Sequence, residues 1–166
     1  MNIENKDLSI SELIEKYTDM VYRIAFSRTQ NVYDAQDITQ DVFLKYIKYT
    51  QAGNVFREEE HRKAWLLKVA VNTGNTFVKT AWARHRASLT EVGEMAQSME
   101  EKSEVYYAVM ELPEKYRIPI HLFYFEELSI KEIAGILKMS ETAVKSRLHR
   151  AREMLKDKLK EADYEF

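Results

Sequence analysis

Cysteine is absent from this sequence, and glycine and proline are scarce, with 4 and 2 of them among 166 residues. The absence of cysteine excludes a disulfide framework, a thiolate metal site and a cysteine nucleophile. Folds built from strands and turns need more turn-forming residues, so the composition favours an all-helical protein. No apolar run reaches the roughly 18 residues of a membrane-spanning helix, and the acidic, polar start is unlike a signal peptide. We therefore expect a cytoplasmic protein without membrane insertion.

Charge is nearly balanced over the whole sequence, with 25 Lys+Arg and 27 Asp+Glu, but it is unevenly distributed. Residues 57–86 hold seven basic and three acidic side chains, and residues 131–160 hold nine and four. Between them, residues 86–104 hold two basic and five acidic ones. This segregation suggests two surfaces that contact a polyanion, although two solvated helix faces explain the counts equally well.

Capping signals divide the first half of the sequence. Ser9 and Glu12 fit a capping box, and Asp34 is the expected N-cap of the next helix. With apolar residues at helical spacing, these signals predict three helices over residues 9–29, 34–49 and 61–86.

The second half begins after a stretch, residues 88–103, that lacks a sustained apolar face. Pro113 suits a first helical position, and Pro119 should kink or shorten the helix that follows. Ser129 opens a second capping box, and Ser140 is the expected N-cap of a last helix that reaches about Glu161. We expect an all-α fold of two small helical domains joined by a flexible acidic linker. The first domain covers residues 1–88, the linker residues 89–104 and the second domain residues 105–166.

The helix expected over residues 34–49 has a polar side with one apolar residue in it. At about 100° per residue, the core side holds Ile38, Val42, Phe43 and Tyr46. The opposite side, which we call the acidic stripe, holds Asp37, Gln40, Asp41, Leu44 and Lys48. A solvated face explains the acids, and a single exposed leucine is common. A partner-binding surface with an apolar anchor and a charged rim explains both features, so the two interpretations stay open.

The helix expected over residues 61–86 carries a continuous stripe opposite its apolar side. This mixed stripe consists of Trp65, Lys68, Asn72, Asn75, Lys79, Trp82 and Arg86. It suits single-stranded nucleic acid because cations neutralise phosphates, amides read base edges and rings stack on unpaired bases. Alternatively, the tryptophans pack under a neighbouring helix. We expect Trp65 to be partly core and Trp82 to be the better stacking residue, and the preceding loop to close over a displaced base with Phe56, Arg57 and Arg62.

Residues 129–155 have the pattern of a helix-turn-helix. A short apolar helix is followed by a tight turn at Lys138, where glycine or asparagine is easier, and then by a second helix. The inner edge of that helix is expected to hold Val144, Leu148, Ala151 and Leu155. Its outward side can enter a major groove with its N-terminal residues at the base edges. A plain helical hairpin is the alternative.

Four motifs occur in order along nearly the whole sequence: DAQDITQDVF at 34–43, AWLLKVAVN at 64–72, LPEKYR at 112–117 and AVKSRLHRAR at 143–152. Together they resemble the extracytoplasmic-function class of bacterial RNA polymerase sigma factors. The resemblance implies a transcription initiation factor with no catalysis, cofactor or metal of its own. It also implies that the first domain binds the beta-prime coiled coil of core polymerase and melts the minus-ten element, that the second reads the minus-thirty-five duplex, and that an anti-sigma protein is a partner.

The resemblance assigns roles to the three faces. The polymerase-binding positions are then Asp34, Asp37, Gln40, Asp41, Leu44 and Lys48. The minus-ten positions are Phe56, Arg57, Arg62, Lys63, Trp65, Lys68, Asn72, Lys79, Trp82 and Arg86. The minus-thirty-five positions are Ser140, Thr142, Lys145, Ser146, Arg147, His149 and Arg150.

Two positions depart from the family pattern. Thr76 stands where the family usually has an acid, and fewer cations follow it, which predicts weaker upstream duplex contact or a narrower promoter set. Glu127 stands where the family often has glycine, which predicts a strained turn before Ser129. Two rival functions are a helix-turn-helix regulator that acts without joining polymerase, and an adaptor that binds polymerase or an anti-sigma protein but not DNA.

Overall fold

The computed structural model describes residues 8–84 and 104–160, with the backbone alone for residues 81–84, and every regular element in these ranges is a helix. The chain divides into two compact units, residues 1–90 and 91–166. The expected all-helical fold of two domains is therefore confirmed. Almost all of the predicted linker lies outside the described residues, so its flexibility and the domain bounds stay predictions.

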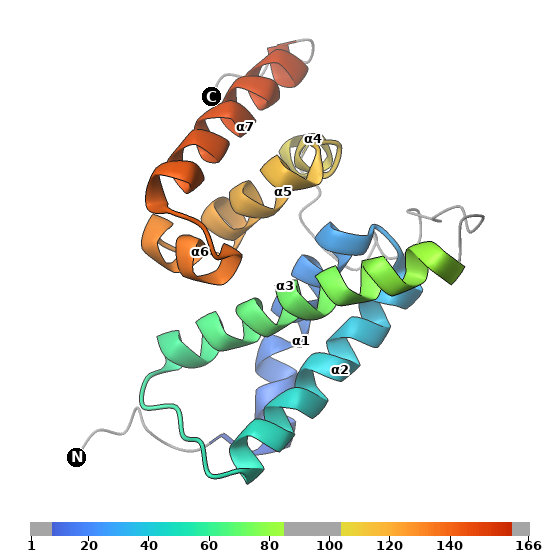
Figure 1. Cartoon of the computed structure of the whole chain (residues 1–166), viewed down its shortest axis with the longest axis vertical. Helices are drawn as coiled ribbons and strands as arrows, with labels where there is room; N and C mark the ends of the chain where they lie inside the picture. Colours follow the sequence, from blue (N-terminus) through green and yellow to red (C-terminus); the bar gives the residue numbers. More distant parts are fainter. Residues whose placement is uncertain (1–7, 85–103, 161–166) are drawn as a thin grey trace. The chain divides into compact units, whose positions relative to one another are not determined.

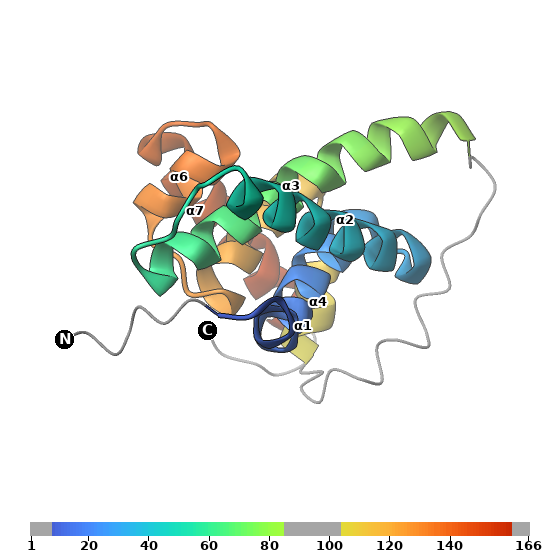
Figure 2. The ribbon, with the colours of Figure 1, turned by 90° about the horizontal axis from the view of Figure 1, so that it is seen from below.

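The N-terminal unit consists of three helices, α1 (Ile10–Thr29), α2 (Val32–Gln51) and α3 (Glu59–Arg84). Each packs against the other two, and the last turns of α3 extend past α2 (Figures 1 and 2). Their shared core includes Leu13, Ile24, Ile38, Leu66 and Leu67, all fully buried. The outer sides of α2 and α3 therefore lie away from the core of this unit.

The starts of α1 and α2 show how local chemistry sets helix ends. The capping box is confirmed, because Ser9 Oγ accepts from the Glu12 N–H and a Glu12 carboxylate oxygen accepts from the Ser9 N–H, both at 3.2 Å. The prediction of Asp34 as the second N-cap is wrong. Asn31 has the extended backbone of an N-cap, and its side-chain oxygen accepts from the Asp34 N–H at 3.0 Å. Asp34 instead lies in the first turn, where a carboxylate interacts favourably with the helix dipole.

The C-terminal unit contains α4 (Glu104–Met110), α5 (Glu114–Ile120), the π-helical turn η3 (His121–Phe125), α6 (Ile130–Leu137) and α7 (Glu141–Lys160) (Figure 1). Pro113 is the N-cap of α5, one residue before the first helical position that was predicted for it. The helix ends one residue after Pro119 and continues as η3. Because proline has no N–H, the carbonyl four residues before it loses its helical donor. That carbonyl belongs to Lys115, and it accepts instead from Arg147 of α7 at 3.4 Å.

The helix-turn-helix is formed by α6 and α7, and its predicted signals are present. Ser129 and Glu132 exchange both capping-box hydrogen bonds at 3.1 Å, and Ser140 Oγ accepts from the Ala143 N–H at 3.1 Å. Glu127 and Lys138 have positive φ angles, 58° and 56°, the left-handed backbone that favours glycine. The inner edge of α7 is buried as predicted, at Val144, Leu148, Ala151 and Leu155.

Gly135 is expected to limit the stability of α6, because it lies inside the helix and a Cβ there would meet no atom within 4 Å. Gly135→Ala should stabilise the helix-turn-helix by about 1 kcal/mol, seen as slower amide hydrogen exchange in α6 and α7. The same substitution at Gly74 is the control, since a Cβ there would lie 3.0 Å from Arg28 Cγ. Unchanged exchange in the Gly135 variant would contradict the prediction.

Candidate nucleic-acid and partner interfaces

The acidic stripe lies on the outer side of α2, as its periodicity predicts. Asp37, Gln40 and Lys48 are exposed, and Leu44 is 56% exposed, which makes it one of the large apolar side chains that the fold leaves in solvent. Asp34 and Asp41 are half-buried beside it. The residues predicted for the core side of α2 are all buried. The stripe therefore offers one apolar side chain within an acidic and polar rim.

Lys45, which the sequence analysis did not single out, links the acidic stripe to α3. Its ammonium lies 3.1 Å from a carboxylate oxygen of Asp41 and donates to Thr73 Oγ1 at 2.9 Å. Thr73 is buried in α3. The spacing of Asp41 and Lys45, four residues apart on a helix, is the signal that predicts such a pair. Lys45 therefore bridges the Asp41 carboxylate of α2 and the Thr73 hydroxyl of α3.

The mixed stripe is only partly exposed. Lys68 and Lys79 are exposed, whereas Asn72 and Asn75 are half-buried. The Asn75 side-chain oxygen accepts from Arg28 Nε of α1 at 2.8 Å. The side chain of Trp82 and the whole of Arg86 lie outside the described residues. The outer side of α3 thus presents cations, with amides set deeper between them.

Trp65 belongs to an aromatic cluster with Tyr46, Tyr49 and Phe56, so the interpretation of Trp65 as partly core is confirmed. Its ring centroid lies 4.8 Å from that of Tyr49 and 5.7 Å from that of Phe56. The rings of Tyr46 and Phe56 stack at 5.7 Å with an angle of 7° between their planes. Phe56 is therefore packed in this structure rather than held out for a base, while Arg57 beside it is exposed.

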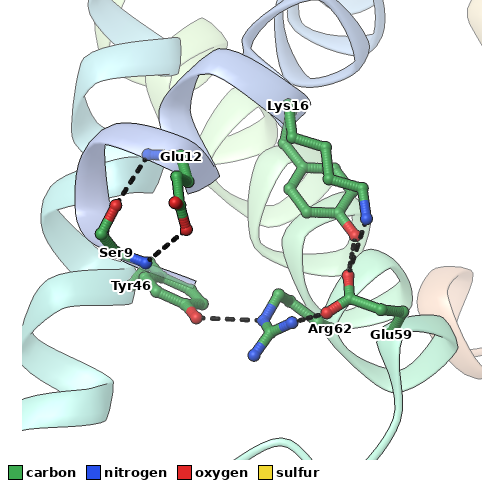
Figure 3. A network of polar contacts seen from close by, with 7 residues as sticks. Ser9, Glu12, Lys16, Tyr46, Glu59 and Arg62 are labelled. Carbon is green, nitrogen blue, oxygen red and sulfur yellow. Dashed lines mark hydrogen bonds and ion pairs between the residues drawn. The ribbon is translucent and has the colours of Figure 1, made fainter. Parts of the chain in front are cut away.

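Arg62 does not lie on the outer surface where the sequence placed it. The residue is 5% exposed, its Nε donates to the Tyr46 hydroxyl at 3.1 Å, and its guanidinium forms an ion pair with Glu59 (Figure 3). Glu59 also accepts from the Tyr17 hydroxyl and from Lys16. Burial raises the pKa of Tyr17, and the nearby Arg62 cation partly offsets this.

The Arg62 network has a physical reason. A buried guanidinium is costly unless it is paired and hydrogen-bonded. Tyr46 of α2 and Glu59 of α3 supply these partners, and Tyr17 of α1 in turn donates to Glu59. Its neighbour Lys63 is half-buried, although the sequence gives the two cations the same predicted role. Only the packing distinguishes them.

The outer side of α7 is open along the part predicted to meet DNA. Exposed side chains there are those of Ser140, Thr142, Lys145, Ser146, His149 and Arg150. Arg150 forms an ion pair with Glu153 at 3.2 Å, and His149 Nε2 lies 3.3 Å from the same carboxylate. Arg147 is half-buried through its bond to the Lys115 carbonyl. The first turns of α7 therefore present hydroxyl groups and a lysine next to the helix N-terminus.

The side of the C-terminal unit formed by η3 and α7 carries a cation on two rings, a feature that the sequence analysis missed. The Arg152 guanidinium lies 5.4 Å from the Phe123 ring centroid and 5.7 Å from that of Tyr124, and its Nε donates to the Tyr124 hydroxyl at 3.1 Å.

His121 is fully buried with its Nε2 3.3 Å from a carboxylate oxygen of buried Glu126. His121 is thus a packed side chain of the core.

Neither a membrane-crossing helix nor a group of three or more His, Asp or Glu residues able to hold a metal occurs within residues 8–84 and 104–160.

Comparisons with known proteins assign both units. The family model of sigma-70 region 2 matches residues 13–84, and that of sigma-70 region 4 matches residues 102–155. RNA polymerase sigma factor SigV of Bacillus subtilis is 32% identical over 146 residues, which cover 86% of either protein. The ECF RNA polymerase sigma factor SigW of the same organism is 26% identical over 171 residues, which cover 92% of this chain and 90% of SigW.

Two solved structures share the fold. The sigma factor RpoE, solved in complex with the anti-sigma factor NepR from Bartonella quintana, matches with a TM-score of 0.71 at 19% identity, over 90% of this chain and 96% of that one. CnrH, solved in complex with the cytosolic domain of CnrY, matches with a TM-score of 0.62 at 24% identity, over 93% and 89% of the two chains.

Proposed function

The chain belongs to the extracytoplasmic-function class of RNA polymerase sigma factors, non-enzymatic proteins that direct the polymerase to promoters, and we propose that three of its faces divide this work. One binds core polymerase, one holds the melted minus-ten element, and one reads the minus-thirty-five duplex.

The acidic stripe, with Asp34, binds the beta-prime coiled coil of core polymerase. Exposed Leu44 inserts into the partner, and Asp37, Gln40 and Lys48 form the polar rim around it. This proposal is supported by the combination of an apolar anchor and acids on one helix face, which a partner helix with basic residues complements.

The outer side of α3 and the loop before it hold the opened minus-ten element. Exposed Lys68 and Lys79 contact the phosphates, Asn72 reads a base edge, and exposed Arg57 contacts the DNA from the loop before α3. Lys63 and Trp65 border this surface. Trp82 and Arg86, which complete the mixed stripe in the sequence, are the further contacts that we propose. The exposure of the cations in line along α3 supports this role.

The first turns of α7 enter the major groove of the minus-thirty-five element. Thr142, Lys145 and Ser146 face the base edges, while Ser140, Arg147, His149 and Arg150 contact the backbone. The buried inner edge of α7 and its exposed outer side support this role, because the inner edge holds the helix against the unit while the outer side remains available to DNA.

The function implies a regulator and a compartment. RpoE and CnrH, which share the fold, were solved with an anti-sigma factor and with the cytosolic domain of CnrY. We infer that a protein anti-sigma factor also holds this chain, and that the chain works in the cytoplasm, where core polymerase is found.

The observation that carries the proposal is the acidic stripe with exposed Leu44, since a regulator that acts without polymerase needs only the helix-turn-helix. The test is transcription by core polymerase with this chain on a promoter library. Transcripts should start at a fixed distance from a common pair of motifs, and core polymerase alone is the control. The proposal would be contradicted if none of the promoters gave a transcript that depends on this chain.

A further inference from the structure

The loop between α2 and α3, residues 52–58, is anchored at two points and exposed between them. The Asn54 side-chain amide donates to the Tyr49 carbonyl at 2.9 Å, and the Phe56 ring lies in the aromatic cluster. Val55, between these anchors, is 72% exposed, and Arg57 is also exposed. The direction of the exposed tip therefore depends on how the Phe56 ring is held.

Arg62 holds that ring from inside the unit. Its guanidinium carbon lies 5.6 Å from the Phe56 ring centroid, within the range of a cation–π contact. The same guanidinium donates to the hydroxyl of Tyr46, whose ring stacks on Phe56. Arg62 thus contacts the Phe56 ring directly and also holds it through Tyr46, and the arginine is itself almost fully buried.

The partners of Arg62 connect the loop to all three helices of the unit. Glu59 in the first turn of α3 pairs with the guanidinium and also accepts from Tyr17 and Lys16 of α1, as Figure 3 shows for Lys16. The planar fork of an arginine serves a carboxylate, a hydroxyl and a ring face together. A lysine ammonium is a single point charge and cannot reproduce that arrangement.

We infer that Arg62 is a positioning residue for base recognition in the minus-ten element: it acts through Phe56 and residues 52–58, not through a phosphate. This inference rests on the proposed function, in which the loop meets a displaced base. Burial keeps the Arg62 cation from the DNA, whereas the cation–π and hydrogen-bond contacts fix the loop that does meet it. Lys63, next in sequence and half-buried, is the one of the two cations that we propose to contact a phosphate.

The test compares Arg62→Lys with Lys63→Met in holoenzyme on a promoter that the wild-type chain uses. Transcription is measured on the consensus and on each single-base substitution of the minus-ten element, from duplex and from premelted templates. Arg62→Lys should lower the preference for the consensus base at one or two positions, on the order of tenfold. Lys63→Met should weaken all templates equally and lower the salt slope of binding by about one.

Several outcomes are decisive. A uniform loss in Arg62→Lys, or a lowered salt slope, would make Arg62 a structural residue or a phosphate contact and overturn the inference. Tyr46→Phe, which removes only the hydroxyl acceptor, should shift the same base preference to a smaller extent, and it carries the test if Arg62→Lys does not fold. Wild-type holoenzyme without any promoter-dependent transcript would instead refute the proposed function itself.

Discussion

Leu44→Ala is expected to weaken binding of the chain to core polymerase on the order of 30-fold, equivalent to about 2 kcal/mol, and to lower promoter-directed transcription in parallel. The side chain is 56% exposed in the free chain and is surrounded by Asp37, Gln40 and Asp41. An apolar side chain that is buried only in a complex loses its contacts when truncated, and the polar rim cannot replace them. The dissociation constant of labelled chain and core polymerase measures the effect directly.

Asp41→Lys should have a still larger effect. It reverses a charge of the acidic stripe and places a second cation beside Lys45, which now lies 3.1 Å from the Asp41 carboxylate. The reversed charge removes complementarity to a basic partner helix. Like charges at this spacing on a helix also repel each other, which disturbs the hydrogen bond from Lys45 of α2 to Thr73 of α3. Circular dichroism and amide exchange should show that the unit still folds.

Ile14→Ala is the matched control for Leu44→Ala. Ile14 is a similarly sized apolar side chain, 38% exposed on α1, and lies outside the acidic stripe. We expect its truncation to leave polymerase binding within about twofold, as for most residues outside a hot spot. If transcription survived in both Leu44→Ala and Asp41→Lys, the chain would act at promoters without joining polymerase through α2.

The sequence predicted those parts of the fold that depend on neighbouring residues. Both capping boxes, the inner edge of α7 and the outer side of α2 follow from spacing within one helix, and the structure confirms them. The N-cap of α2 was predicted at Asp34 and is Asn31. Both side chains can cap a helix, and the backbone angle that decides between them is not visible in the sequence.

The parts that the sequence could not predict depend on packing between helices. Arg62 and Lys63 are adjacent cations before an aromatic motif, so a sequence pattern treats them alike. Arg62 is buried because Tyr46, sixteen residues away, and Glu59, which is itself held by α1, provide its partners. Arg147 is similar, because the carbonyl that it reaches is released by Pro119 of a different helix.

Lys145→Glu is expected to lower the affinity of holoenzyme for its promoter on the order of 100-fold at constant salt. Lys145 is exposed in the second turn of α7, on the side that we propose enters the major groove. The exchange removes a contact that discriminates bases by about 1–3 kcal/mol and adds a carboxylate that faces the phosphates. Titrating promoter duplex with holoenzyme at several salt concentrations measures both the loss and the salt slope.

Lys160→Glu separates this local effect from a change of net charge. Lys160 is also exposed on α7, but it lies 15 residues further along, about 22 Å at the rise of an α-helix, and so beyond the groove-reading turns. Both variants have the same net charge, and both should bind core polymerase like the wild type. Equal losses of promoter affinity would show that only the overall charge matters. Unchanged affinity in Lys145→Glu would instead support an adaptor that joins polymerase without reading DNA, because a helix seated in the groove cannot accommodate a carboxylate at that position without cost.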